Sequence, residues 1–303
     1  MGDSRPGLRE VFLATRPWSF PLTIIAVGFG IAYGYWSTGY INVPLSIIAI
    51  AGSILLHALV NVTNDYFDYS RGVDKPGAGT TMYRPHPIVH GILSPKATLS
   101  LGLSLGSLGL ATAFILALQD RILAPIMGAL GFILAYGYTG PPFNLKYRAL
   151  GELAVFVAWG PLMSIGGYYI ATGSTAFLEP ALASIPVGSL VTSVLLANNL
   201  RDIKYDKEAG IRTLAIILGR NWGLKLYAVL TIIVPSASLA VLAIVGVVPL
   251  ISLISLVSIY PLAKLYNVMR KEIPIDADPR TAQATLLFGA LYIMSIVLSS
   301  LIQ

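Results

Sequence analysis

The chain has 303 residues, of which 55% are hydrophobic and only 11% are charged, and its formal net charge is +6. A soluble domain carries roughly a quarter charged residues, so this chain has too few polar side chains to cover a surface that faces water. It contains no cysteine, which excludes disulfides, thiolate metal sites and cysteine nucleophiles.

Nine apolar stretches follow one another along the chain, each long enough to cross a hydrocarbon core of about 30 Å as a helix. None alternates with the period of two that membrane strands show. In chain order the predicted spans are Pro17–Trp36, Val43–Val60, Ala97–Leu118, Ile122–Tyr138, Leu150–Thr172, Pro180–Ala197, Leu224–Gly246, Val247–Tyr266 and Ala282–Leu301. The sequence therefore predicts an all-α helical bundle of nine transmembrane helices, formed by one domain over residues 1–303.

The charged residues divide unevenly between the two sides of this topology. Of the 20 Lys and Arg residues, all except Arg121 fall on the side that holds the N-terminus. The positive-inside rule makes that side cytoplasmic and places the chain in the cell membrane as a multi-pass protein. Of the 14 acids, all except Asp120 and Glu179 lie on the same side. Carboxylates contribute little to orientation, so these acids need another explanation.

The first group of acids closes the second predicted span. Asn64 and Asp68 are four residues apart, so on a helix they share one face. Asp65 lies beside them on another face. Gly72 allows a turn that would bring Asp74 back toward the end of the helix.

The second group closes the sixth predicted span. Asn198, Asp202 and Asp206 form a ladder of two successive four-residue steps on one helix face. Carboxylates at this spacing repel each other unless a cation lies between them. Oxygen ligands of this kind indicate Mg²⁺, which prefers carboxylates, water and substrate phosphates. The alternative is that both groups are solvated helix ends, although two such groups in a chain with few charges favour a shared site.

Basic residues lie on the same predicted side as the acids. Arg16 opens the first span, Arg84 follows the second span, Lys146 follows the fourth and Arg212 follows the sixth. Lys and Arg bind phosphate oxygens through charge-assisted hydrogen bonds. Each of them alone is explained by topology, but beside Mg²⁺-type carboxylates they indicate a site for a diphosphate.

Together these motifs resemble the UbiA-type membrane prenyltransferases. The resemblance rests on Asn64-x₃-Asp68-x₅-Asp74, on Asp202-x₃-Asp206, on Arg16-Pro-Trp, on Tyr-Thr-Gly-Pro-Pro with Lys146, and on Gly-Ile-Arg-Thr213-Leu. It implies nine transmembrane helices around a central cavity, with Mg²⁺ and a prenyl diphosphate at its cytoplasmic end. The segments Asn-Asp-Tyr-Phe-Asp-Tyr-x-x-Gly-Val-Asp and Ala-Asn-Asn-x-Arg-Asp are most similar to the branch that prenylates dihydroxynaphthoate on the route to menaquinone.

The function that follows is Mg²⁺-dependent transfer of an isoprenoid chain, from a donor such as geranyl or geranylgeranyl diphosphate, to an aromatic quinone precursor. The expected metal ligands are Asn64, Asp68, Asp74, Asp202 and Asp206. The expected diphosphate contacts are Arg16, Asn64, Lys146, Asn198 and Arg212. Asp65, Asp68 and Asp202 are the expected catalytic residues, with Asp65 polarising the acceptor or accepting its proton.

Other functions remain open at this stage. The acceptor could be 4-hydroxybenzoate, geranylgeranylglyceryl phosphate or haem, and a transporter with ion-carrying carboxylates is a rival from another class. Transporters usually place such residues near the bilayer midplane, whereas these acids lie at span ends. A phosphatidyltransferase would carry a different aspartate signature. Nucleic acid is not an expected partner, the prenyl tail is expected to lie among the spans next to membrane lipid, and the oligomeric state is left open.

Overall fold

The computed structural model describes residues 7–77 and 79–302, and every regular element within them is helical. The α-helices are α1 (Leu8–Ala14), α2 (Phe20–Thr38), α3 (Val43–Ser70), α4 (Gly79–Tyr83), α5 (Pro95–Ala117), α6 (Ala124–Gly137), α7 (Gly151–Val157), α8 (Met163–Thr172), α9 (Leu178–Ala183), α10 (Ile185–Glu208), α11 (Leu214–Ala228), α12 (Val234–Ile244), α13 (Ile259–Lys271) and α14 (Ala277–Ile302). Short 3₁₀ or π-helical segments are η1 (Pro17–Ser19), η2 (Leu145–Tyr147), η3 (Ala158–Leu162), η4 (Val229–Ile233) and η5 (Leu250–Ser258).

Seven of the nine predicted spans coincide with helices that are long and apolar enough to cross a membrane, counted over the described residues. The fourth predicted span is the shorter apolar helix α6, Ala124–Gly137. The sixth differs because Ser184 separates α9 from α10, and Pro186 lies at the start of α10. Helix α10 then continues past the apolar stretch to Glu208, so that its last turns are charged. The all-helical membrane fold is thus confirmed, whereas nine crossings remain a prediction.

Glycine allows two pairs of helices to approach very closely. A Cβ atom on Gly30 of α2 would lie 1.9 Å from the Ser164 carbonyl oxygen of α8, and one on Gly167 would lie 2.3 Å from the Val27 carbonyl oxygen. Helices α3 and α5 meet in the same way, because a Cβ on Gly52 would lie 2.1 Å from the Thr112 hydroxyl. Small residues of this kind are how membrane helices pack without a hydrophobic driving force.

The segment η5 has a period of three in its sequence. Ser252, Ser255 and Ser258 are fully buried, and a 3₁₀-helix of three residues per turn aligns them on one face. The Ser295 hydroxyl of α14 donates to the Ser252 hydroxyl at 3.0 Å. Small side chains on this face therefore let the eighth predicted span pack tightly against α14.

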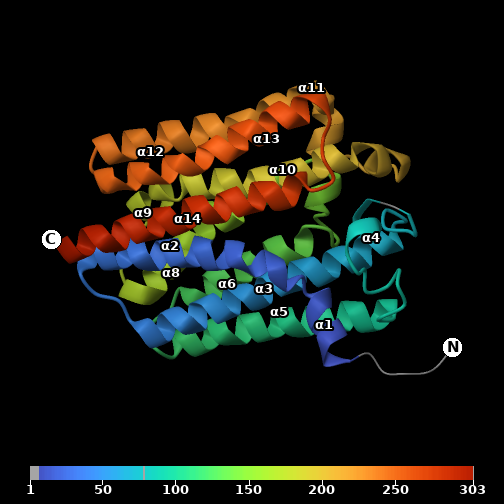
Figure 1. Cartoon of the computed structure of the whole chain (residues 1–303). Helices are drawn as coiled ribbons and strands as arrows, with labels where there is room; N and C mark the ends of the chain where they lie inside the picture. Colours follow the sequence, from blue (N-terminus) through green and yellow to red (C-terminus); the bar gives the residue numbers. More distant parts are fainter. Residues whose placement is uncertain (1–6, 78, 303) are drawn as a thin grey trace.

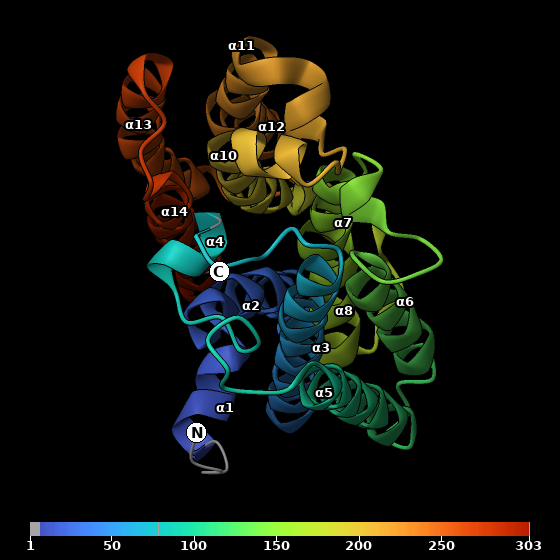
Figure 2. The ribbon, with the colours of Figure 1, turned by 90° about the vertical axis from the view of Figure 1, so that its right-hand side faces the viewer.

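One end of the bundle gathers the chain segments that carry the acids. In Figure 1, α4, the end of α10 and the connection from α13 to α14 lie at the right, while the C-terminus lies at the opposite end. Figure 2 views the molecule from that right-hand end, and the helices are seen nearly along their axes. The largest core cluster ties α2, α10, α12 and α14 together through buried side chains such as Phe29, Leu190 and Phe288.

Candidate active site

The first aspartate motif occupies the last turns of α3 and the turn that follows. Gly72 has φ +73°, and the backbone N–H groups of Val73 and Asp74 donate to the Asp68 carbonyl at 2.9 and 3.2 Å. The chain therefore folds back and buries Asp74 beside the helix end, as the position of Gly72 led us to expect.

Asp68 is the centre of a buried ion pair. The Lys146 ammonium donates to Asp68 Oδ2 at 2.6 Å, and the Tyr147 hydroxyl donates to Oδ1 at 2.7 Å. Both donors come from η2, where the backbone N–H of Lys146 is held by the Tyr138 carbonyl at 2.8 Å. Burial lowers the pKa of Lys146, but the Asp68 carboxylate raises it well above its usual value overall, so the ammonium is charged.

Asp65 is fully buried and is shared by two arginines. Arg84 contacts both carboxylate oxygens, at 2.6 and 3.2 Å, and Arg16 donates to Oδ1. The structure therefore places Asp65 as the partner that holds these guanidinium groups. Its expected role toward the acceptor stays a prediction, and its ion pairs favour a positioning role instead.

His86 joins the same network from the loop after α4. Its Nε2 lies 3.1 Å from Asp74 Oδ2 and 3.9 Å from Asp65 Oδ1. One atom able to bind a metal ion from each of these three residues lies within 4.8 Å of the other two. His86 Nδ1 accepts backbone N–H groups from Ile88 and Val89, so Nε2 carries the proton and donates to Asp74. Asp65 is already paired with two arginines, so within this cluster Asp74 is the better candidate for a metal ligand.

The second aspartate motif is held by one arginine. Arg201 contacts both carboxylate oxygens of Asp202, at 2.9 and 2.8 Å, and donates to Asn198 Oδ1 at 2.6 Å. The same guanidinium donates to Asp278 at the start of α14. Helix α14 thereby fixes the orientation of a predicted metal ligand on α10.

The acids of the two motifs influence one another electrostatically. Asp206 lies on the charged extension of α10, and its pKa is raised to about 7, mainly by burial. The carboxylates of Asp202, Asp68 and Asp74 contribute to this rise, and the Lys146 ammonium opposes it. Lys146 is therefore near enough to acids of both groups to interact with them, on the side where the sequence placed all three.

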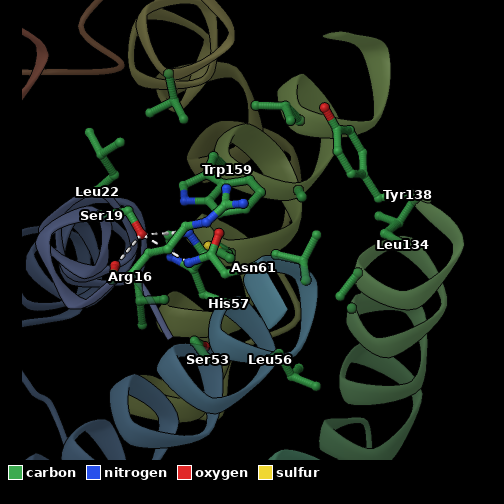
Figure 3. A pocket seen from close by; sticks show the side chains of 18 of the residues that line it. Arg16, Ser19, Leu22, Ser53, Leu56, His57, Asn61, Leu134, Tyr138 and Trp159 are labelled. Carbon is green, nitrogen blue, oxygen red and sulfur yellow. Dashed lines mark hydrogen bonds between the residues drawn. The ribbon is translucent and has the colours of Figure 1, made fainter. Parts of the chain in front are cut away.

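A cavity of about 780 Å³ lies next to these charges. Five of the predicted site residues line it, namely Arg16, Asn64, Asp68, Lys146 and Asn198. Asp65, Asp74, Asp202 and Asp206 are buried but are not among its lining residues. Figure 3 shows Arg16 across the cavity from Leu134 and Tyr138, which belong to α6 and its end.

Arg212 is exposed and, within residues 7–77 and 79–302, is not a lining residue. Its backbone pairs with that of Arg148.

The donor set suits a hard divalent cation such as Mg²⁺. Asn64 Oδ1 is a buried oxygen to which no described residue donates a hydrogen bond. A buried polar atom without a partner is costly, and a cation would satisfy it. The neighbouring ligand atoms are carboxylate oxygens, which Mg²⁺ prefers.

Several functional contacts had weak or no sequence signals. Arg84 and Lys146 were recognisable as cations, but not their individual carboxylate partners. Tyr147 and Asp278 were not predicted, because a lone tyrosine and an aspartate at a helix start are common without function. Arg201 was visible beside Asp202, yet its bond to Asp278 joins residues 77 positions apart.

Known proteins share both the sequence and the architecture of this chain. The model of the UbiA prenyltransferase family matches residues 22–283. UbiA prenyltransferase domain-containing protein 1 of Mus musculus is 32% identical over 292 residues, which cover 95% of this chain and 83% of that protein. The same protein of Xenopus tropicalis is 31% identical over 292 residues, which cover 95% of this chain and 81% of that protein.

Solved structures agree with the fold. A UbiA homologue from Archaeoglobus fulgidus bound to GPP and Mg²⁺ superposes with a TM-score of 0.69 at 17% identity, covering 95% of this chain and 99% of that one. A digeranylgeranylglyceryl phosphate synthase superposes with a TM-score of 0.62 at 14% identity, covering 98% and 99%. With the family model matching most of its length, the chain belongs to the UbiA prenyltransferase family and is a prenyltransferase.

Proposed function

We propose that this prenyltransferase moves an isoprenoid chain from an allylic diphosphate, such as geranyl or geranylgeranyl diphosphate, to an aromatic acceptor of the dihydroxynaphthoate type. The observation that carries the proposal is a cavity of about 780 Å³ with mainly apolar walls, lined at one end by Asn64, Asp68, Lys146 and Asn198. This volume is in the upper part of the range of roughly 300–1,000 Å³ for ligand pockets, which suits two substrates held together.

The diphosphate would lie at the charged end of the cavity. Mg²⁺, held by Asn64 and by the four aspartates of the two motifs (Asp68, Asp74, Asp202 and Asp206), would supply the positive charge that stabilises the leaving group. Lys146 and Arg16 would donate to phosphate oxygens, and Asn198 would orient them from α10. The exposed position of Arg212 suits attraction of the anion from solvent better than contact within the site.

The chemistry then follows from the two environments in the cavity, the charged end and the apolar walls. The C–O bond of the allylic carbon breaks, and its electron pair leaves with the diphosphate. Apolar side chains such as Leu56, Leu134 and Met163 keep water from the allylic cation. An electron-rich ring carbon attacks it with a π electron pair and forms the new C–C bond. The group that this carbon carried then leaves without its bonding electrons, as a proton from C–H or as CO₂ from a carboxylate, and the ring regains aromaticity.

The distribution of cations favours an aromatic acceptor over a phosphorylated one. Within the described part of the chain, the basic residues that line the cavity are Arg16, Arg84 and Lys146, and all three contact carboxylates of the first motif. A glycerol-phosphate acceptor would need a second basic cluster deeper in the cavity. Away from the aspartates the cavity is lined mainly by apolar side chains, and its polar members, such as Ser53, Asn61 and Thr112, are neutral.

We also propose that the charged end faces the cytoplasm, since the excess of Lys and Arg follows the positive-inside rule. The test of the whole proposal uses detergent-purified protein with labelled geranyl diphosphate, Mg²⁺ and separate candidate acceptors: dihydroxynaphthoate, 4-hydroxybenzoate, geranylgeranylglyceryl phosphate and haem. A labelled product of the expected mass from dihydroxynaphthoate supports it. Transfer only to one of the other acceptors would overturn the naphthoate assignment.

A further inference from the structure

A polar cluster lines the cavity one helical turn away from the aspartates, and the diphosphate does not account for it. Its lining members are Ser19 of η1, His57 and Asn61 of α3 and Trp159 of η3. Thr23 of α2 is fully buried and is hydrogen-bonded to His57. Figure 3 shows Ser19, His57, Asn61 and Trp159 close together, facing Leu134 of α6. One wall of the cavity is therefore polar and the opposite wall is apolar.

The hydrogen bonds within this cluster determine which atoms donate. The Ser19 hydroxyl donates to the Arg16 carbonyl at 2.8 Å, so His57 Nε2, at 3.2 Å, must donate to Ser19 Oγ. His57 Nδ1 then accepts from the Thr23 hydroxyl at 2.8 Å. Trp159 Nε1–H donates to the same hydroxyl at 3.2 Å, which completes a consistent network.

Asn61 is the member of the cluster with an unused polar atom. Its side-chain nitrogen donates to the Thr15 carbonyl at 2.9 Å and to Ser19 Oγ at 3.0 Å. Both N–H groups are thus used, and the carbonyl of Thr15, which can only accept, fixes the orientation of the amide. Asn61 is 8% exposed and lines the cavity. No described residue donates to its Oδ1, so this oxygen is presented to whatever occupies the cavity.

We infer that Asn61 Oδ1 accepts the hydroxyl hydrogen of the aromatic acceptor, and that the cluster behind it forms the acceptor subsite. An oxygen that can only accept selects a ligand that donates. Asn61 lies three residues before Asn64 on α3, about 4.5 Å along the helix, so a ring bound there lies close to the carbon that loses diphosphate. The Trp159 indole offers a flat aromatic surface for the ring, and the apolar wall of α6 is left for the isoprenoid chain.

The inference rests on the proposed function and predicts a selectivity. A naphthoate whose hydroxyl is replaced by methoxy keeps an electron-rich ring but has no hydrogen to donate. We expect wild-type protein to show a KM at least tenfold higher for the methoxy compound than for the hydroxyl compound. In Asn61→Ala the KM for the methoxy compound should be less than threefold that for the hydroxyl compound, because the KM for the hydroxyl compound rises.

The matched control is Thr63→Val, because Thr63 is fully buried on α3 and its hydroxyl donates to the Leu59 carbonyl of its own helix at 2.8 Å. This variant should keep the wild-type ratio. The KM for geranyl diphosphate should be unchanged in both variants, which shows that they are folded. Direct binding of both naphthoates by calorimetry should reproduce the ratios without turnover.

The outcomes are distinguishable. Equal KM values for the two compounds with wild-type protein, or an unchanged ratio in Asn61→Ala, would overturn the acceptor subsite and leave the proposed function standing. If Asn61→Ala does not fold, the wild-type ratio and binding data decide alone. Failure of wild-type protein to transfer the geranyl group to any hydroxylated aromatic would overturn both.

Discussion

Replacing Lys146 by Met separates the two tasks that we assign to the charged end of the cavity. The ammonium lies 2.6 Å from Asp68 Oδ2, and its side chain is only 11% exposed. In the reaction it would donate to the leaving diphosphate. Loss of one such preorganised donor costs about 2.7–4 kcal/mol of transition-state stabilisation, so kcat/KM for geranyl diphosphate should fall by about 10²–10³.

The Mg²⁺ dependence of the same variant should move in the opposite direction from that of a ligand variant. Lys146 competes with a cation for Asp68, so Lys146→Met should reach half-maximal activity at a Mg²⁺ concentration at or below that of the wild type. Asp68→Asn removes a ligand charge and should need more Mg²⁺. The assay is transfer from labelled geranyl diphosphate over a Mg²⁺ titration.

Lys204→Met provides the control, because Lys204 is exposed on the same end of α10. It should change neither quantity by more than about twofold, as is usual for surface substitutions. If Lys146→Met kept more than a tenth of the wild-type kcat/KM, the diphosphate role would be refuted. A Mg²⁺ requirement raised as much as in Asp68→Asn would refute the competition between the ammonium and the metal.

Three further predictions follow from individual contacts. Asp202→Ala should abolish Mg²⁺-dependent transfer, and normal turnover of this variant would rule out the second motif as part of the site. Asp278→Asn weakens the contact that holds Arg201, and Arg201 orients Asp202. The apparent Mg²⁺ affinity should therefore fall about tenfold, as for other groups that orient metal ligands. An unchanged Mg²⁺ titration would refute this positioning role. Gly30→Ala places a Cβ 1.9 Å from the Ser164 carbonyl oxygen, so overpacking should destabilise the protein by about 1–3 kcal/mol; a melting temperature in detergent equal to the wild type would show that α2 and α8 can separate freely.

Much of the charged end could be predicted because its key spacings are local. The four-residue step from Asn64 to Asp68 and the turn at Gly72 need only the geometry of one helix and one glycine. The partners could not be predicted in the same way. Asp68 meets Lys146 across 78 positions, and such pairing depends on how irregular loops cross the end of the bundle, for which a sequence has no periodic signal.

The helix boundaries illustrate the same limit. The sixth predicted span was placed by its hydropathy, which does not register that Pro186 starts a new helix or that the charged residues after Asn198 continue it. In contrast, the serines at 252, 255 and 258 recur every third residue, and this period is a readable signal for the 3₁₀ geometry of η5. Hydropathy identifies what is buried in lipid, whereas helix ends depend on backbone chemistry.

The two halves of the charged end differ in how their charge is balanced. Three basic side chains each contact a carboxylate of the first motif, so the protein supplies its own counter-ions there. In the second half, Asp202 and Asp278 share Arg201, and burial together with the neighbouring carboxylates raises the pKa of Asp206. A cation that enters the first half would therefore have to displace basic side chains from the carboxylates. A cation beside Asp206 would instead relieve the repulsion among neighbouring acids.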